Sequence, residues 1–215
     1  MRKTTRRKPP GLAAPKRTRA AYDEERSAAT RVKILEATFE CLHDLGHGGA
    51  STVEVCKRAG IERGTLLHHF PDRATLLASA LEHVFEKRRA EFLRRADRLQ
   101  EERARGKPGA VAIELLWKAV DAPSTVVWLE LVVAARTDPS LHRALVKMGR
   151  AFDEKIQATF AELFPEDAAS EGPFSSLRVP FAFALMNGLV LDRLAGFGAR
   201  VPSVLDYLER LAELG

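Results

Sequence analysis

The sequence predicts an all-α protein in which a small helix-turn-helix headpiece precedes a larger helical domain. Apolar residues recur at three- and four-residue spacing through most of the chain, which is typical of amphipathic helices. No segment combines sustained apolar–polar alternation with β-branched residues, so we expect no strands. With 215 residues, 46% of them hydrophobic, the chain is long enough for a headpiece and a larger body with its own core.

The first helix of the headpiece is defined by an apolar stripe that a glycine ends. It should begin at about Glu24 or Ser27 and run to Leu45, where Gly46 terminates it. We expect its buried side to carry four apolar residues, which are Val32, Leu35, Phe39 and Leu42.

The next stretch predicts two short helices that cross at a tight turn. The first spans about 52–59, and the second spans about 63–70 and is closed by Pro71. Gly60 lies between them and can adopt the positive φ that a sharp turn between helices often requires. This is the pattern of a helix-turn-helix, whose second helix lies in the major groove of DNA. The alternative is an ordinary helical hairpin inside a helical core.

Six further helices are predicted beyond the headpiece, separated by proline, glycine and charged residues. Their approximate spans are 73–105, 110–120, 123–136, 139–163, 179–194 and 202–214. Asp72 should cap the first of them, and Asp138 followed by Pro139 is a strong helix start. Pro180 should either lie in the first turn of its helix or kink it.

Several short motifs follow one another at fixed spacing within residues 26–82. They are Ile34-Leu35-Glu36-Ala37, Leu45-Gly46-His47, Ser51-Thr52-Val53, Ala59-Gly60-Ile61 and Gly64-Thr65-Leu66-Leu67-His68-His69-Phe70-Pro71-Asp72-Arg73. In this order they resemble the amino-terminal domain of the tetracycline-repressor (TetR) family of bacterial transcription regulators. The resemblance implies a DNA-binding regulator that usually forms a dimer through its last two long helices, and whose helical body responds to a small molecule.

Seven headpiece residues are candidate DNA contacts, namely Ser51, Thr52, Arg63, Gly64, Thr65, His68 and Arg73. Arg63 lies in the first turn of the recognition helix, where it can donate two hydrogen bonds to guanine. Thr65 and His68 suit a base or a phosphate, and Gly64 permits close approach of the backbone. The two hydroxyl residues at the start of the second helix, with its free N–H groups, suit a phosphate. The resemblance implies that Arg73 occupies the position of a phosphate-binding lysine.

Two positions depart from the pattern of the family, and the headpiece is not basic. Glu62 replaces the usual serine or threonine N-cap, and Leu67 replaces a tyrosine that contacts phosphate in the family. From residue 21 to residue 73 there are seven basic and nine acidic residues, which is a net charge of −2. We therefore expect that other residues supply much of the electrostatic attraction to DNA.

The first twenty residues are strongly basic and contain no acidic side chain. Their eight cations are Arg2, Lys3, Arg6, Arg7, Lys8, Lys16, Arg17 and Arg19. Since the whole chain carries +5, the rest of it carries −3. The sequence therefore predicts a disordered basic arm over 1–22, a helix-turn-helix domain over 23–72 and an effector-binding and dimerisation domain over 73–215. The arm either tracks DNA phosphates or enters the minor groove, and the alternative is a solvated leader.

An apolar cavity for a small effector is predicted in the helical body. Its candidate lining residues are Trp117, Trp128, Met148, Phe152, Phe181, Met186 and Asn187. The alternative for each aromatic residue is ordinary core packing. The resemblance implies that the effector favours a dimer whose recognition helices no longer match the spacing of the grooves.

The last two helices predict a homodimer. A helix that is apolar nearly all round, as over 179–194, needs cover on every side, and one amphipathic partner cannot provide it. Two copies can complete the cover as a four-helix bundle across a two-fold axis. Two recognition helices about 34–36 Å apart would then read a palindromic operator. A fully intramolecular core is the alternative.

The sequence contains no pattern of a common enzyme or metal site. It lacks GxSxG, HExxH, a P-loop and a dinucleotide-binding fingerprint, so we expect no catalytic residues and no cofactor. Cys41, His43 and His47 are not spaced to meet on one side of a helix, so no metal site is expected. A degenerate family member that binds proteins instead of DNA, or less plausibly a small-molecule enzyme, remains as an alternative function.

Neither a membrane span nor export is expected. The longest apolar candidate, 179–194, contains a proline, an asparagine and two charged residues. The basic amino terminus lacks the apolar core of a signal peptide, which favours the cytoplasm.

Overall fold

The computed structural model describes residues 18–103, 108–163, 165 and 177–214, and its regular elements there are helices, as the sequence predicts. In chain order these elements are α1 (Arg19–Gly49), α2 (Thr52–Ala59), α3 (Arg63–His69), α4 (Arg73–Arg103), α5 (Pro108–Val120), α6 (Pro123–Ala135), α7 (Pro139–Leu163), α9 (Arg178–Asp192), the π-helical turn η2 (Arg193–Phe197), the 3-10 turn η3 (Gly198–Arg200) and α10 (Val201–Leu214).

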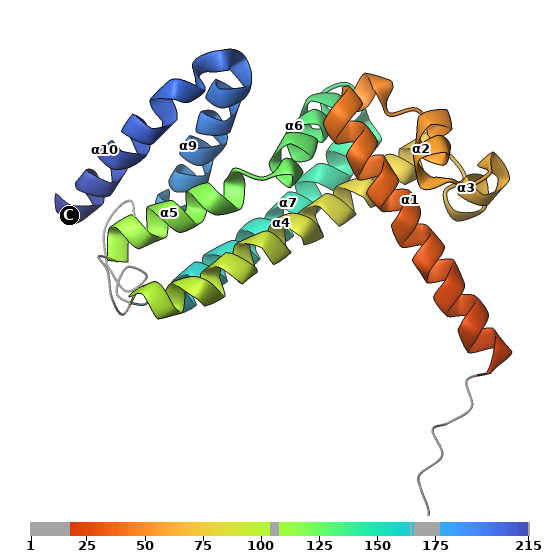
Figure 1. The fold of residues 1–215 in the computed structure, drawn as a ribbon, viewed down its shortest axis with the longest axis horizontal. Helices are drawn as coiled ribbons and strands as arrows, with labels where there is room; N and C mark the ends of the chain where they lie inside the picture. Colours follow the sequence, from red (N-terminus) through yellow and green to blue (C-terminus); the bar gives the residue numbers. More distant parts are fainter. Residues whose placement is uncertain (1–17, 104–107, 164, 166–176, 215) are drawn as a thin grey trace, which may run out of the picture.

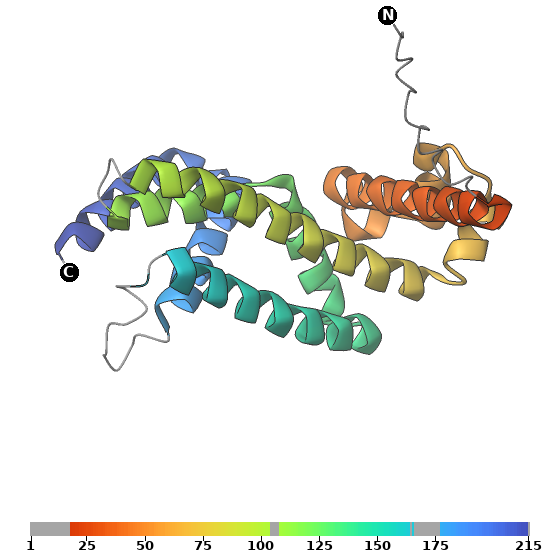
Figure 2. The ribbon, with the colours of Figure 1, turned by 90° about the horizontal axis from the view of Figure 1, so that it is seen from below.

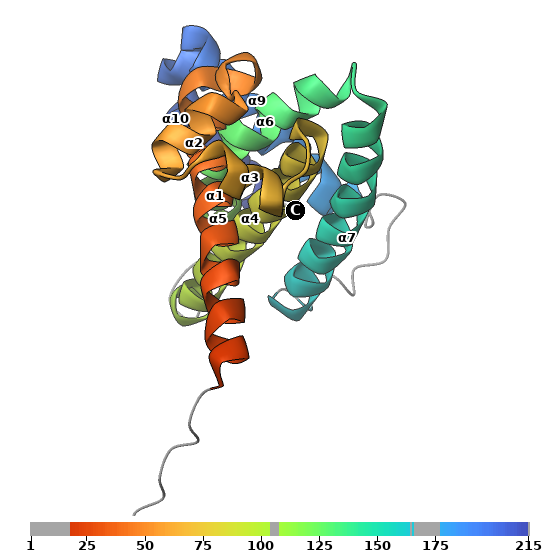
Figure 3. The ribbon, with the colours of Figure 1, turned by 90° about the vertical axis from the view of Figure 1, so that its right-hand side faces the viewer.

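The molecule is elongated, with its headpiece and its carboxyl-terminal helices at opposite ends (Figure 1). The long helices α4 and α7 pack against each other along the body, and α6 packs on both (Figures 1 and 2). The segment from α9 through the two short turns to α10, called the C-terminal hairpin below, packs on α5. The amino-terminal turns of α1 project away from everything else (Figure 3).

Helix α1 begins at Arg19, five residues before the earlier of its two predicted starts. Thr18 is its N-cap, because the side chain accepts a hydrogen bond from the Ala21 N–H at 3.4 Å. These first turns are exposed, so no apolar stripe in the sequence marked them. The last four residues of the predicted arm, 1–22, are therefore helical, and the prediction for 1–17 lies outside the described residues.

The buried face of α1 differs in part from its predicted face. Leu35 and Leu42 are buried and Phe39 is half-buried, but Val32 is 51% exposed and its predicted burial is wrong. Ile34 is fully buried instead. Arg31 already contacts the Phe70 ring and the Ser79 hydroxyl, so the packing of α1 begins before Val32. Val32 lies about 200° around the helix from Ile34 and therefore faces away from the core.

The helix-turn-helix forms because local caps start and stop its short helices where the sequence predicts. The Ser51 Oγ accepts a hydrogen bond from the Glu54 N–H at 3.2 Å and so caps α2. Gly60 adopts the left-handed conformation, with φ +58° and ψ +45°, and directs the chain into the turn. Leu66 and Phe70 are fully buried and fix α3 to the rest of the headpiece.

The body helices follow their predicted spans closely. The Asp138 Oδ1 accepts hydrogen bonds from the N–H groups of Ser140 and Leu141, at 2.9 and 3.0 Å, which fixes the start of α7. Pro180 lies in the first turn of α9, the first of the two predicted possibilities.

Two apolar cores hold the molecule together. The first joins the headpiece to α4, α6 and α7, and residues as far apart as Ile34 and Leu131 are fully buried in it. The second joins the far end of α4 to α5, α7 and the C-terminal hairpin around Phe92 and Val190. Because α4 contributes to both cores, it connects the two ends of the molecule physically.

One helical run in the described chain, Val179–Leu211, is long and apolar enough by composition to cross a membrane. Gly196, with φ +92°, lies in the turn that divides this run, so the run is not one straight rod. The α-helix before the turn, α9, has 15 residues, fewer than the roughly 20 that a spanning helix needs. Its inner face, around Met186 and Val190, is buried in the second core.

Candidate nucleic-acid interface and ligand cavity

The recognition helix α3 exposes three of its candidate DNA contacts and half-buries a fourth. Arg63, Gly64 and His68 are exposed on one end of the molecule, and Thr65 is half-buried. Within the described chain, Arg63 has no ion-pair partner, so its guanidinium is available to an external acceptor. His69 is half-buried, and burial lowers its pKa, with the neighbouring charges acting in the same direction.

Two hydroxyl side chains lie at the start of α2, and only that of Ser51 forms a hydrogen bond within the described residues. The Ser51 hydroxyl oxygen already accepts the Glu54 N–H, so its own hydrogen remains as a donor. Thr52 is half-buried at the first position of the helix. Both lie where the unpaired N–H groups of a helix start attract an anion.

Arg73 is half-buried and bonded to other residues of the protein rather than free on its surface. Its Nη2 donates to the His47 carbonyl oxygen at 2.7 Å, and its Nη1 lies 3.3 Å from the His47 Nε2. The His47 N–H in turn donates to the Glu130 Oε2 at 2.8 Å. Arg73 can therefore reach a phosphate only by leaving these partners. Burial, together with the charge of Arg73, lowers the pKa of His47 below its ordinary value.

The headpiece is linked to the body through Arg73, His47 and Glu130, and Gly46 makes this link possible. Gly46 interrupts α1 with φ +67° and ψ 178°, a backbone conformation that is open almost only to glycine. The interruption brings the His47 N–H toward Glu130 on α6, while Arg73 approaches from the start of α4. The end of α1, the start of α4 and the middle of α6 are thus held at one point, called the interdomain link below.

Several other cations of the headpiece have partners within the protein. Arg58 pairs with Asp44 at 2.7 Å, and Lys57 lies 3.7 Å from Glu54. Arg31 donates to the Ser79 hydroxyl at 3.0 Å and lies 4.4 Å from the centre of the Phe70 ring. Apart from Arg63, only Arg26 and Lys33 are exposed headpiece cations that form no ion pair within the described residues.

A cavity of about 340 Å³, open to solvent on one side, lies between α4, α6, α7 and α9. Its lining consists of aromatic and aliphatic side chains with a few polar groups: Phe85, Arg88, Trp128, Val132, Leu145, Gly149, Phe152, Asp153, Ile156, Phe183 and Asn187. Trp128, Phe152 and Asn187 belong to the set predicted from the sequence.

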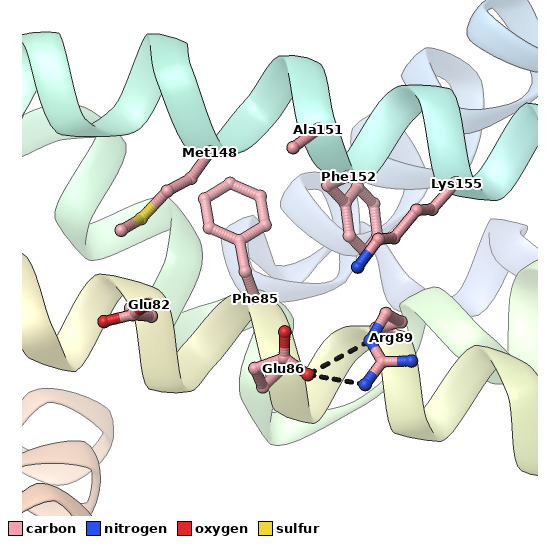
Figure 4. A pocket seen from close by; sticks show the side chains of 8 residues that line it. All are labelled: Glu82, Phe85, Glu86, Arg89, Met148, Ala151, Phe152 and Lys155. Atoms are coloured by element: carbon pink, nitrogen blue, oxygen red, sulfur yellow. Dashed lines mark hydrogen bonds and ion pairs between the residues drawn. The ribbon is translucent and has the colours of Figure 1, made fainter.

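The other four predicted lining residues lie elsewhere. Met148 lines a smaller neighbouring groove of about 180 Å³ between α4 and α7 (Figure 4). Phe85 and Phe152 line both this groove and the cavity. Trp117 and Met186 pack in the second core. Phe181 is 66% exposed on the outer side of α9, because the inner side of this helix is occupied by its buried residues.

Arg88, a buried cation in the cavity wall, was not among the residues predicted from the sequence. It is only 5% exposed, its Nη1 donates to the Thr125 hydroxyl, and its guanidinium lies 4.8 Å from the centre of the Trp128 ring. Burial lowers its pKa to about 10, against the opposing charge of Glu91, so it remains a cation at neutral pH. The available signal was its register: it lies at helical spacing within the apolar stripe of α4, between Phe85 and Phe92.

Known proteins resemble this chain along most of its length. The regulator BetI of Burkholderia mallei is 29% identical over 187 residues, which cover 84% of this chain and 92% of BetI. A solved transcriptional regulator of Rhodococcus sp. RHA1 has a TM-score of 0.64 at 24% identity, over 85% of this chain and 92% of its own. A solved regulator of Saccharomonospora viridis, in complex with choline, has a TM-score of 0.62 at 16% identity, over 86% and 94% of the two chains.

The fold and the exposed recognition helix define a DNA-binding transcription regulator of the helix-turn-helix type. Residues 34–80 match the family described as bacterial regulatory proteins, tetR family, and residues 109–214 match the tetracyclin repressor-like C-terminal domain. The chain belongs to the TetR family, which confirms the resemblance seen in the sequence. This family consists of transcription regulators and not of enzymes. No group of three or more potential metal ligands occurs among the residues described.

Proposed function

We propose that this regulator is a dimeric repressor, which leaves a palindromic operator when a small, largely apolar molecule enters its cavity. The observation that carries the proposal is the course of α4. Arg73 at its start belongs to the interdomain link, and Phe85 and Arg88 farther along line the cavity. Fifteen positions separate the two sites, which is about 22 Å along a helix.

A ligand in the cavity can therefore act on the headpiece through one continuous element. If it shifts the packing of α4 between α6 and α7, it also shifts Arg73 and the helices that this residue holds. The shift need only favour a dimer in which the two recognition helices no longer match successive grooves. A coupling of roughly 1–3 kcal/mol gives partial release, and full release requires more.

Operator recognition is assigned to the exposed end of the headpiece. Arg63 and Thr65 address base edges, Gly64 allows close approach, and His68 contacts a base or phosphate. Hydroxyl and N–H groups at the start of α2 bind a phosphate. The basic arm over 1–17 supplies much of the attraction that the weakly acidic headpiece lacks.

The dimer is assigned to the C-terminal hairpin. Large apolar side chains are exposed along its outer side, namely Phe181, Leu191, Leu194, Phe197, Tyr207 and Leu211. An exposed apolar surface of this extent indicates a protein–protein interface. Two hairpins related by a two-fold axis would cover both surfaces as a four-helix bundle.

The small-molecule part of the proposal is supported by the cavity and by the relative from S. viridis, whose fold holds choline. We place the regulator in the cytoplasm, where its operator would be accessible.

The proposal is tested by fluorescence anisotropy of the full-length protein with DNA from upstream of its own gene. A shuffled duplex of the same length and a salt series serve as controls. We expect two protomers to bind the intact duplex at least about a thousandfold more tightly than the shuffled one, since specific binding usually exceeds non-specific binding by about 10³–10⁷. Equal binding to both duplexes that salt abolishes to the same degree would contradict operator recognition at this site.

A further inference from the structure

The cation in the cavity wall lacks one hydrogen-bond acceptor. The Arg88 Nε–H is buried, and no acceptor for it is present in the described part of the chain. The remaining contacts of the guanidinium are the Thr125 hydroxyl and the faces of two rings, with the Phe152 ring centre at 5.7 Å. A buried charge is unfavourable unless it is paired and fully hydrogen-bonded. A ligand that brings an anion to Arg88 would therefore gain more than it would at an exposed arginine.

Glu91, the carboxylate whose charge acts on Arg88, does not supply this acceptor. The Ser124 hydroxyl donates to the Glu91 Oε2 at 2.5 Å. Within the described residues, Glu91 forms no ion pair with Arg88, although its charge acts on the guanidinium from one turn away. The protein thus keeps a counter-charge near Arg88 without filling the position beside its Nε.

A second polar group of the lining is also incompletely bonded. The Asn187 Nδ2 donates to the Phe183 carbonyl oxygen at 2.8 Å, which leaves the Oδ1 as the free end of the amide. This Oδ1 is buried, and it has no donor among the described residues. It can accept a hydrogen bond from a hydroxyl or N–H group of a ligand.

We propose that the effector of this cavity is a small carboxylate with an aromatic or branched apolar body. Its carboxylate accepts hydrogen bonds from the Arg88 guanidinium, its body fills the space between the Trp128 and Phe152 rings, and a donor on the body pairs with Asn187. The volume of about 340 Å³ lies at the lower end of the range of ligand sites, so the effector is smaller than most drugs. The proposal rests on the proposed function, because it takes the cavity as the effector site.

The proposed effector is an anion, whereas choline, which the S. viridis relative holds, is a cation. A cation in this cavity would lie against Arg88. Asp153 is the one carboxylate in the described lining, and it is exposed and accepts a hydrogen bond from the Gln157 amide at 2.7 Å. The charge of the wall therefore selects anions among molecules of equal shape.

The test compares probes that share one apolar body and differ in charge. Phenylacetate, 2-phenylethanol and 2-phenylethylamine, together with the corresponding hydroxyphenyl compounds, branched aliphatic carboxylates of six to ten carbons and choline, are titrated into the full-length protein by calorimetry. We expect at least one carboxylate to bind about tenfold or more tightly than its neutral and ammonium counterparts, since hydrogen bonds to a charged partner are the stronger ones. This comparison uses the wild-type protein, so it does not depend on the folding of a variant.

Two variants then assign the effect to its residue. Arg88→Gln should reduce carboxylate binding by about tenfold or more and leave binding of the neutral alcohol nearly unchanged. Arg89→Gln is the matched control, because Arg89 is the next residue, lies outside the lining of the cavity and pairs with Glu86 at 2.7 Å. Binding of the ammonium compound or choline as tight as that of every carboxylate would overturn the proposal. So would a failure of all carboxylates to bind, or carboxylate binding that Arg88→Gln does not weaken.

Adding operator DNA separates this proposal from the proposed function. A carboxylate that binds through Arg88 without releasing DNA supports the ligand class and contradicts ligand-controlled repression. Release of DNA by a cation alone supports ligand-controlled repression and contradicts the ligand class.

Discussion

Arg63 is the residue on which sequence discrimination should depend most, because it is exposed in the first turn of α3 and has no ion-pair partner in the described chain. We expect Arg63→Ala to weaken binding to the operator by about 1–3 kcal/mol and to change binding to shuffled DNA much less. Anisotropy titrations with both duplexes measure the difference.

Lys57→Ala provides the comparison for Arg63. Lys57 is exposed on α2, outside the recognition helix, and lies near Glu54. Its loss should weaken binding to both duplexes to a similar, small degree. If Arg63→Ala also weakened both duplexes equally, its role would be limited to phosphate contact.

Gly46 is the residue whose backbone conformation the interdomain link requires. A Cβ at this position would lie 3.1 Å from the Glu130 Oε2, in addition to the strain of φ +67°. Gly46→Ala should therefore destabilise the protein by about 1–3 kcal/mol. Gly48→Ala should be neutral or slightly stabilising, since a Cβ there meets open space and its φ is negative. Urea unfolding of both variants makes the comparison, and equal effects would contradict it.

At this scale the sequence predicts local features well and distant ones poorly. Ser51 and Gly60 act within four residues of their own positions, so residue type and spacing were sufficient to predict where α2 begins and where the chain turns. Arg73 and Arg88 find their partners 26 and 37 positions away in the sequence. Only the packing of helices brings such groups together, and spacing along one helix does not contain that information.

At the scale of helices, Glu36 joins α1 to α4. Its carboxylate accepts from the His83 Nε2 at 2.9 Å and the Lys87 Nζ at 2.7 Å. Burial alone would raise the pKa of Glu36, but Lys87 and His83 outweigh it, and the pKa lies below its ordinary value of 4.5. A carboxyl group with a lowered pKa stabilises the folded state above its unfolded pKa, and this contribution is lost as the pH falls through the folded value.

Glu36→Gln should remove this pH-dependent contribution. The wild type should be more stable than the variant near pH 6, and the difference should shrink once the pH falls below 4.5. Urea unfolding of both proteins at a series of pH values measures it. A difference that stays constant down to about pH 3 would show that Glu36 acts only through packing or neutral hydrogen bonds.

Helix spans were predictable because apolar periodicity, proline and glycine are encoded within each segment. Which face of each helix is buried was less predictable. Val32 is apolar but lies on the side of α1 that faces away from Ile34 and the core. Phe181 belongs to an apolar helix whose outer side has no cover within the described chain. Trp128 and Phe152 were predicted to line a cavity because they are aromatic, and they do line it. Trp117 and Met186 were predicted on the same kind of ground, as large apolar residues, but they pack in the second core. Residue type alone does not distinguish a cavity wall from a filled core.

At the scale of the whole molecule, the proposed dimer depends on the outer side of the C-terminal hairpin. Leu191 is 51% exposed there, and Leu191→Glu would place a charge in the interface. We expect this variant to be monomeric by sedimentation and to lose tight binding to a palindromic duplex. Val133→Glu, at a similarly exposed apolar position on α6, should remain dimeric. A dimeric Leu191→Glu protein would place the interface elsewhere.

The basic arm should contribute to the affinity of the whole molecule without adding specificity. Deletion of residues 1–17 removes seven cations and leaves the Thr18 cap of α1 in place. We expect weaker binding to operator and shuffled duplexes alike. The dependence on salt concentration should also be smaller, by about 0.9 in log–log slope for each phosphate that the arm neutralises in the full-length protein. An unchanged slope would mean that the arm does not bind DNA.

The projecting start of α1 also has a consequence for the length of DNA that the protein covers. Residues 19–29 are all exposed and helical, which makes a rod about 16 Å long between the root of the arm and the packed headpiece. At 3.4 Å for each base step, this equals almost five base pairs. The arm is thus anchored away from the bases beneath α3, and a nuclease footprint should extend several base pairs beyond the sequence that the recognition helices read.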